Sequence, residues 1–283
     1  MPSPVIENRP LVMGILNVTP DSFSDGGRWF ERERAIMRAH EMIDEGADVV
    51  DVGGESTRPG AEPVSEDEEL RRVIPVVASL AGHIRVSVDT TKEAVAAAAV
   101  GAGATLINDV SASLWPVAAH FGVGWVAMHR KGTPASMQHD PHYVDVVAEV
   151  SALLVERARQ AEDGGVDEVW IDPGIGFGKT VDHNLRLLGA VDELVATGYP
   201  VMVGTSRKTF LGSLTRSADG STVPVADRLA GSVATATWAM QQGARMVRAH
   251  DVSATVQAAV LVGSPGSDAS GPQPGAERSE VAP

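Results

Sequence analysis

The stretch IRVSVDTTKEAVAAAAVGAGATLIND, residues 84–109, holds one full repeat of the pattern that decides the fold. It begins with IRVSV, a short apolar and β-branched run typical of a buried strand. Thr90 and Glu93 then fit the S/T-x-x-E pattern of a helix start, and an alanine-rich segment follows. A second run, ATLI, ends in Asn108 and Asp109. The stretch predicts strand, helix and strand, with polar residues where each strand ends.

The same alternation continues in both directions along the chain. Ser65 and Glu68 form a second helix-start pattern. The runs predicted as strands are LVMGIL from Leu11, DVVDV from Asp48, IRVSV from Ile84, ATLI from Ala104, VGWVAM from Val123, EVWI from Glu168, PVMVG from Pro200 and ARMVRA from Ala244. Eight such units in about 250 residues are typical of a (β/α)8 TIM barrel, an α/β fold. A doubly wound open sheet gives the same alternation, but the count of eight favours the barrel.

A single domain accounts for most of the 283 residues. We expect the barrel to span residues 10–263, because no stretch within it has the composition of a linker. Residues 1–9 carry two prolines and no periodicity, and we expect a lead-in there. Residues 264–283 are rich in Pro, Gly and Ser, so we expect a disordered C-terminal tail.

Charge and missing residue types exclude several classes of protein. Asp and Glu number 37 against 23 Lys and Arg, a formal charge of −14 that disfavours nucleic acid and anionic membranes as partners. No apolar run approaches the length that crosses a bilayer. Without cysteine or an HExxH motif, we expect no disulfide, thiol catalysis or zinc site. Since no signal-peptide pattern is present, we expect a cytoplasmic protein.

Polar residues follow nearly every predicted strand. They are Asn17, residues 53–55, Asp89, Asn108, Asp109, His129, Asp172, residues 204–208, Arg248 and His250. In a barrel all carboxyl ends of the strands open on one face, so we expect these side chains to converge on one mouth. Because Asp and Asn also cap helices and form turns, part of the set is structural on the alternative interpretation.

Two cationic segments indicate a site for an anionic, planar substrate. Residues 206–208, Ser-Arg-Lys, and residues 248–250, Arg-Ala-His, follow the last two strands, where barrels commonly bind phosphate. The arginine at the second segment can stack on an aromatic ring. Asp89, Asn108 and Asp172 offer acceptors to a heterocycle with adjacent N–H donors.

Two other interpretations of the mouth stay open. Asp172 could pair with Lys208, and Asp89 with Arg248, as structural ion pairs without any ligand. An oxygen-rich mouth containing Asn17 and Asp89 could hold Mg2+, which takes few protein ligands together with water and substrate phosphate.

The glycine-rich stretch PGIGFGKT, residues 173–180, fits neither common nucleotide-binding motif. A P-loop needs glycine at position 173, and the spacing here is G-x-G-x-G rather than G-x-G-x-x-G. We expect these glycines to let the backbone approach a flat ligand closely, with a plain flexible loop as the alternative. Residues 18–30 and 55–64 are long connections after the first two strands, and we expect mobile loops that act as lids.

Taken together, these segments resemble the dihydropteroate synthase family over about residues 11–263. The motifs are GILNVTPDSFSDGG from Gly14, DVGGESTRPG from Asp51, SVDT from Ser87, INDVS from Ile107, MH at Met128, GTP-x-x-MQ from Gly132, DPGIGFGKT from Asp172, GTSRK from Gly204 and VRxHD from Val247. The resemblance implies a TIM barrel that condenses p-aminobenzoate with (7,8-dihydropterin-6-yl)methyl diphosphate. The products would be 7,8-dihydropteroate, for folate biosynthesis, and pyrophosphate, with Mg2+ as cofactor.

The resemblance also implies roles for individual residues. Those implied for the pterin are Asp89, Asn108, Met128, Asp172, Phe177, Gly204, Lys208 and Arg248. Those implied for p-aminobenzoate and the diphosphate are Thr57, Arg58, Pro59, Thr209 and His250, and Asn17 is implied for Mg2+. The implied catalytic residues are Phe23, Asp25, Lys208 and Arg248.

An SN1-like substitution suits these residues, because a dihydropterin can stabilise a methylene cation and the protein then supplies positioning and charge. The main alternative is a noncatalytic pterin-binding paralogue, which the intact motifs disfavour. A corrinoid methyltransferase that uses methyltetrahydrofolate would not need the Ser-Arg-Lys segment, and a generic phosphate-binding barrel is a third alternative. The family implies a homodimer, for which the sequence offers only the apolar helix DVSATVQAAVLV from Asp251.

Two stretches depart from the family pattern. After INDVS the chain continues with Ala112 rather than the usual glycine, and the loop there is expected to be short. Residues 214–226 form an insert that we expect to be a surface loop.

Overall fold

Eight parallel strands form the centre of the fold. The computed structural model describes residues 9–19, 27–56, 61–133, 136–216 and 220–263. The strands are β1 (Leu11–Asn17), β2 (Val49–Gly53), β3 (Arg85–Asp89), β4 (Leu106–Asp109), β5 (Gly124–Met128), β6 (Val169–Asp172), β7 (Met202–Val203) and β8 (Met246–Ala249). Each coincides with one of the apolar runs, so the strand prediction is confirmed.

The strands close into a barrel. Their hydrogen-bonded order is β6-β5-β4-β3-β2-β1-β8-β7. An isolated parallel bridge between Ile171 and Val201 joins the two outer strands, and the Ile171 N–H donates to the Pro200 carbonyl at 3.1 Å. A doubly wound sheet would leave two open edges, so this closure confirms the (β/α)8 TIM barrel.

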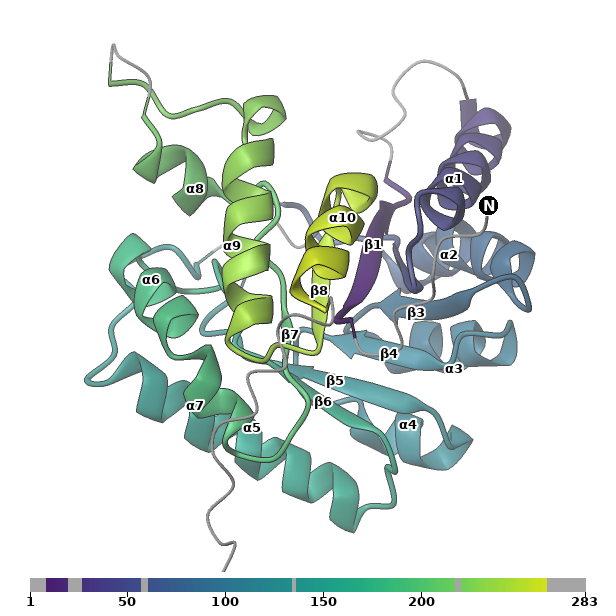
Figure 1. Cartoon of the computed structure of the whole chain (residues 1–283). Helices are drawn as coiled ribbons and strands as arrows, with labels where there is room; N and C mark the ends of the chain where they lie inside the picture. Colours follow the sequence, from purple (N-terminus) through teal and green to yellow (C-terminus); the bar gives the residue numbers. More distant parts are fainter. Residues whose placement is uncertain (1–8, 20–26, 57–60, 134–135, 217–219, 264–283) are drawn as a thin grey trace, which may run out of the picture.

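Helices separate successive strands and cover the outside of the barrel (Figure 1). They are α1 (Gly27–Asp44), α2 (Glu66–Leu80), α3 (Glu93–Gly101), α4 (Trp115–Phe121), α5 (Val146–Asp163), α6 (Val181–Gly189), α7 (Val191–Val195), α8 (Thr209–Leu214), α9 (Leu229–Gln241) and α10 (Val252–Val262). A 3₁₀ turn, η2 (Val225–Asp227), precedes α9.

One of the two predicted helix starts is wrong. Ser65 caps α2 as expected, because its side chain accepts a hydrogen bond from the Glu68 N–H at 3.4 Å. At α3 the cap position is Lys92, and its side chain makes no capping hydrogen bond. The Thr90 hydroxyl accepts from the Lys92 N–H at 3.2 Å, so it closes a turn before the helix begins.

Two apolar layers hold the barrel together. One fills its interior and consists of strand residues: Met13, Val49, Leu106, Val126, Trp170, Met202 and Met246. The larger layer lies between strands and helices and includes Val50 and Val52 of β2. Successive residues of a strand face opposite sides. Since both sides are buried, the strands appear in the sequence as continuous apolar runs.

Both stretches that depart from the family pattern have the expected character where they are described. Asp109 ends β4 and α4 begins at Trp115, so the loop between them is short, as expected. The described part of the 214–226 insert runs over the surface, with Leu214 and Val225 48% and 50% exposed.

The chain ends lie outside the described residues, and the lead-in, the tail and the domain limits at 10 and 263 stay predictions. Over the described ranges, no helix is long and apolar enough to cross a membrane.

Candidate active site

Charged and polar side chains meet at the carboxyl ends of the strands. Asp89 and Asp172 end β3 and β6, and Arg248 lies in β8. Arg248 Nη2 donates to Asp89 Oδ2 at 2.7 Å across the mouth. A Cβ on Gly204, just after β7, would lie 3.6 Å from Arg248 Cβ and 3.9 Å from Lys208 Nζ. The expected convergence on one mouth is therefore found for Asp89, Lys208 and Arg248.

Arg248 has a second carboxylate partner that the sequence analysis did not select. Its Nε donates to Oδ2 of Asp51 at 2.6 Å, and Asp51 is fully buried in β2. The ion pair of Asp89 and Arg248, raised above as a structural alternative, is therefore present within a larger cluster. The signal was available: Asp51 is the charged residue of the run VVDVG, two positions from Val49, which belongs to the barrel interior.

The neighbours Asn108 and Asp109 serve different purposes. Asn108 Nδ2 donates to Asp51 Oδ2 at 2.9 Å, while its Oδ1 is buried and has no hydrogen-bond partner among the described residues. Asp109 accepts from the Leu114 N–H at 2.7 Å and from Trp125 Nε1 at 3.2 Å. Asp109 therefore stabilises the short turn before α4, as the structural interpretation of strand-end residues expects, and Asn108 faces the mouth.

Lys208 approaches the mouth from the turn after β7. Its Nζ donates to the Ile175 carbonyl and lies 4.7 Å from the centroid of the Phe177 ring. Lys208 and Asp172, both described, form no salt bridge with each other. Asp172 Oδ1 instead accepts from the Gly174 N–H at 2.7 Å. Burial lowers the pKa of Lys208 to about 8, although the charge of Asp172 opposes this shift.

The carboxylates of the mouth are also displaced from their ordinary ionisation. Burial raises the pKa of Asp89 to about 7 against the opposing charge of Arg248. Burial likewise raises the pKa of Asp172, with Lys208 opposing it. Buried groups with displaced pKa values that share one cleft are typical of functional sites.

A strained turn presents Lys208 to the mouth. The preceding residue, Arg207, has a φ of 58°. Its N–H donates to Ser232 Oγ and its carbonyl accepts from Arg228 Nη1, both at 2.9 Å. The Arg207 guanidinium pairs with Asp251 at 3.0 and 2.5 Å. These contacts hold the unusual backbone conformation and leave Lys208 as the cation of the turn that faces Phe177.

The remaining described candidates lie around this centre. His250 Nδ1 lies 3.0 Å from Ser206 Oγ, which also accepts from the His250 N–H at 3.1 Å. Met128 is buried, and a Cβ on Gly174 would lie 3.4 Å from its Cγ. Asn17 ends β1 half-buried, and Thr209 begins α8 in an exposed position.

The glycine-rich loop after β6 packs against the protein's own backbone. Gly174 and Gly178 have φ values of 62° and 66°. A Cβ at these positions would lie 1.9 Å from the His129 carbonyl oxygen and 2.2 Å from that of Lys131. The close approach expected of the glycines is therefore made, at these two positions, to the segment after β5.

Lys179 anchors the same loop. Its Nζ lies 2.9 Å from His129 Nδ1 and donates to the Phe177 carbonyl at 3.1 Å. Burial lowers the pKa of Lys179 to about 7 and that of His129 to about 3. A neutral His129 accepts through Nδ1, so this strand-end histidine is part of the loop's support.

Five predicted site residues lie outside the described residues: Phe23, Asp25, Thr57, Arg58 and Pro59. The expectation of mobile loops at 18–30 and 55–64 is wrong for part of the first stretch, because α1 already begins at Gly27. For the rest of both stretches it stays a prediction.

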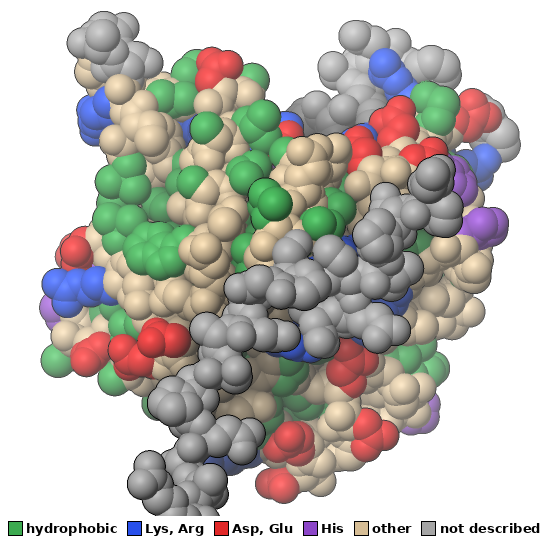
Figure 2. Space-filling model, in the orientation of Figure 1, with side chains coloured by type: hydrophobic (Ala, Val, Ile, Leu, Met, Phe, Trp, Pro, Cys, Tyr) green, Lys and Arg blue, Asp and Glu red, His purple; other side chains and the backbone are tan. Residues whose placement is uncertain are grey.

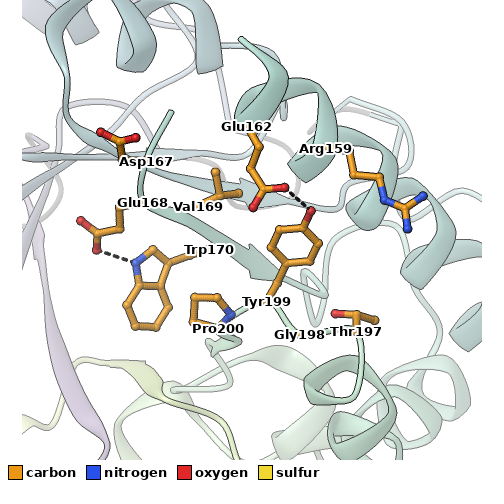
Figure 3. A pocket seen from close by; sticks show the side chains of 10 residues that line it. All are labelled: Arg159, Glu162, Asp167, Glu168, Val169, Trp170, Thr197, Gly198, Tyr199 and Pro200. Carbon is orange, nitrogen blue, oxygen red and sulfur yellow. Dashed lines mark hydrogen bonds between the residues drawn. The ribbon is translucent and has the colours of Figure 1, made fainter. Parts of the chain in front are cut away.

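A hollow of about 450 Å³ lies at the opposite, amino end of the barrel (Figure 3). Its lining is Arg159, Glu162, Asp167, Glu168, Val169, Trp170, Thr197, Gly198, Tyr199 and Pro200. Trp170 Nε1 donates to Glu168 Oε1, and Tyr199 donates its hydroxyl to Glu162 Oε2, both at 2.7 Å. None of the predicted site residues lines this hollow.

Comparison with known proteins identifies relatives along most of the chain. The family described as "Pterin binding enzyme" matches residues 13–250. The dihydropteroate synthase of Mycobacterium leprae is 47% identical over 262 residues, which cover 89% of this chain and 92% of the relative. That of Escherichia coli is 44% identical over 263 residues, covering 90% and 91%.

Solved structures of the same family superpose closely. Dihydropteroate synthase from Xanthomonas albilineans with 4-aminobenzoic acid gives a TM-score of 0.82 at 48% identity, covering 90% of this chain and 92% of that one. The complex of the enzyme from that organism with 7,8-dihydropteroate gives 0.79 at 45% identity and the same coverage, 90% and 92%. By these matches, the chain belongs to the pterin-binding enzyme family, among its dihydropteroate synthases.

Proposed function

We propose that the mouth of the barrel joins p-aminobenzoate to (7,8-dihydropterin-6-yl)methyl diphosphate, releasing 7,8-dihydropteroate and pyrophosphate. The observation that carries the proposal is a set of buried acceptors, Asp89, Asn108 Oδ1 and Asp172, beside two cations, Lys208 and Arg248. A pterin ring presents adjacent N–H donors, which such acceptors bind. A buried acceptor without a partner is costly, so a donor-rich ligand stabilises this arrangement.

The cations of the mouth suit the diphosphate half of the substrate. Because the chain carries a formal charge of −14, the positive charge of Lys208 and Arg248 is a local feature. Both can absorb negative charge that develops on the leaving pyrophosphate. His250 and Ser206 belong to the same two cationic segments, and His250 Nδ1 contacts the Ser206 hydroxyl.

The reaction on this site is a dissociative substitution. The bond between the pterin methylene carbon and the diphosphate oxygen breaks, and its electron pair leaves with pyrophosphate. The amine nitrogen of p-aminobenzoate then bonds to the methylene carbon and loses a proton. Because the dihydropterin stabilises the cation, Arg248 and Lys208 act by positioning and charge rather than as a strong base.

Mg2+ is the cofactor we propose. Among the described residues there is no group of three or more His, Asp or Glu that could hold a metal ion. Mg2+ needs few protein ligands when diphosphate and water supply most of its coordination, and the protein ligand we propose is the amide oxygen of Asn17. When bound, Mg2+ would neutralise charge on the leaving group.

The p-aminobenzoate subsite is proposed beside Lys208 and Thr209. Thr209 is exposed and directly follows Lys208, which supports this placement. The proposal extends to residues of the loops after β1 and β2 that lie outside the described residues: Phe23, Asp25, Thr57, Arg58 and Pro59.

A homodimer is proposed from the apolar surface of the last helices. Hydrophobic side chains gather over α8, α9 and α10 (Figure 2). Among them Leu214, Leu229, Trp238 and Leu261 are 48%, 45%, 42% and 77% exposed. A patch of this kind favours association with a second copy. Sedimentation equilibrium would detect the dimer, and a monomer at micromolar concentration would contradict it. The cytoplasmic location stays a prediction.

The test is pyrophosphate release by the purified protein with the pterin diphosphate and Mg2+, with and without p-aminobenzoate. We expect release that depends on p-aminobenzoate and falls at least about 100-fold in Lys208→Ala. Arg85→Ala, at the amino end of β3, is the control and should stay within about twofold of the wild type. Tight pterin binding without release would favour the noncatalytic paralogue, and release without p-aminobenzoate would favour another phosphate-ester chemistry.

A further inference from the structure

Asp51 is a buried carboxylate in the middle of β2, a strand whose five residues are all buried. It faces the barrel interior, two residues above Val49 of the interior apolar cluster. Its register partner on β3 is Ser87, and the residue opposite Asp89 is Gly53. Asp51 therefore lies one level below the mouth, between the apolar interior and the proposed pterin site.

A single oxygen of Asp51 binds two residues of that site. Oδ2 accepts from Arg248 Nε at 2.6 Å and from Asn108 Nδ2 at 2.9 Å. Through this oxygen β2 is linked to β4 and β8. Arg248 is held at both sides, since its Nη2 donates to Asp89 Oδ2 at 2.7 Å. The two carboxylates thus orient the plane of the guanidinium across the mouth.

The contact with Asp51 decides which way the Asn108 carboxamide faces. Asp51 Oδ2 already accepts from Arg248 Nε, so the Asn108 amide turns its NH2 group toward this oxygen. Its oxygen then points away from Asp51. This Oδ1 is buried and has no partner among the described residues, and the same holds for Asp51 Oδ1. The structure thereby keeps an acceptor, rather than a donor, available at the level of the ligand.

We propose that Asp51 is a positioning and specificity-determining residue, which fixes Asn108 with its acceptor toward the ligand and holds Arg248 by Nε. This inference rests on the proposed function and deepens it. With Asn108 fixed, the three polar side chains Asp89, Asn108 and Asp172 all accept. The pocket then selects a heterocycle edge that presents N–H donors over one that presents a carbonyl.

The test compares two ligands that differ in that edge. 6-Hydroxymethylpterin carries an amino group at position 2, and 6-hydroxymethyllumazine carries an oxo group there. Dissociation constants for both are measured by titration calorimetry on the full chain, without diphosphate or Mg2+. The wild type should prefer the pterin.

Asp51→Val removes the acceptor while keeping a residue typical of this strand. The Asn108 amide can then turn its NH2 group to the ligand, so we expect pterin affinity to fall about tenfold or more and the preference over lumazine to narrow by a similar factor. Asp51→Asn retains an acceptor oxygen and should keep the preference within about twofold. Ser87→Ala is the matched control, because it removes a buried hydroxyl of the neighbouring strand that has no partner in the described part of the chain, and it should change neither affinity.

The outcomes separate this inference from the proposed function. A wild type that does not prefer the pterin would contradict the function itself. A folded Asp51→Val protein with the wild-type preference would overturn the positioning role and leave the function standing. If Asp51→Val does not fold, Asp51→Ala replaces it: a narrowed preference supports the inference, and a wild-type preference in that variant overturns it.

Discussion

The two ends of the barrel both carry carboxylates beside cations, but the pKa values of these carboxylates are shifted in opposite directions. At the amino end, Glu168 accepts from Arg85 Nη2 at 2.5 Å and from Trp170 Nε1 at 2.7 Å. Burial opposes ionisation there, but the hydrogen bonds outweigh it and lower the pKa of Glu168. At the carboxyl end, burial prevails, raising the pKa of Asp172 and lowering that of Lys208.

This difference teaches that a hollow by itself does not identify a site. The hollow of about 450 Å³ lies at the amino end, where the charged groups drawn in Figure 3 include bonded pairs. Toward the carboxyl end, one buried oxygen each of Asp51 and Asn108 has no hydrogen-bond partner within the described ranges. Folded proteins satisfy most buried polar groups, so the unpartnered Asn108 oxygen beside the cations of the mouth favours a ligand there.

The largest difference in activity is expected between two substitutions near opposite ends of β6. Asp172→Ala removes a proposed pterin acceptor and should lower kcat/KM for the pterin diphosphate about 100-fold or more. Glu168→Gln at the amino end should stay within about twofold. Steady-state pyrophosphate release measures both, and similar losses in the two variants would remove the distinction between the ends.

Two glycines with positive φ extend the comparison to stability. Gly174→Ala at the mouth would place a Cβ 1.9 Å from the His129 carbonyl oxygen, whereas at Gly82, before β3, nothing lies within 4 Å. We expect a loss of about 3 kcal/mol or more in the free energy of unfolding for Gly174→Ala. Gly82→Ala should lose about 1 kcal/mol, from the backbone conformation alone. Urea unfolding measures both, and equal losses would show that the mouth loop relaxes freely.

The pH dependence of activity tests the displaced ionisation of Lys208. Its pKa of about 8 means that the ammonium is present below that pH and is lost above it. We expect kcat/KM for the pterin diphosphate to fall about tenfold per pH unit above about pH 8. Lys208→Arg should abolish the fall between pH 8 and 10, whatever its absolute rate, because a guanidinium stays charged. A fall that persists in this variant assigns the titration to another group.

The last comparison concerns Lys179 and the pH dependence of stability. Burial holds its pKa near 7 in the folded state, against 10.5 ordinarily, so the unfolded chain binds more protons between these values. The contribution of this group to the free energy of unfolding therefore rises with pH from about 7 to 10.5 and is constant outside that window. Lys179→Met should lose this rise and about 1 kcal/mol of hydrogen bonding at high pH.

The control for Lys179 comes from the amino end. Arg85→Met removes the cation that pairs with Glu168, away from Lys179, so its pH dependence of unfolding should follow the wild type. Urea unfolding at pH 7 and 9 compares the three proteins. A Lys179→Met variant with the wild-type pH dependence would contradict the lowered pKa.

Strand positions and most mouth residues could be predicted because they depend on local pattern. A strand buried on both faces appears as an apolar run, and its last residue lies on the barrel rim whatever the surrounding sequence. Asp89 is the last residue of β3, and it meets Arg248, which lies one residue before the end of β8. The capping box at Thr90 could not be predicted reliably, since Thr90 and Lys92 compete to start α3 and the backbone turn decides between them.

The sequence by itself determined the order of eight strand–helix units, the family, and the residues on the rim. Only the tertiary structure decided which rim residues face the mouth. Asp109 and His129 support neighbouring loops, Arg207 is bound to Asp251, and Asp51 joins the site from within a strand. The physical reason is that a side chain's partner depends on register between strands that are distant in the chain, whereas alternation along one strand is a local property.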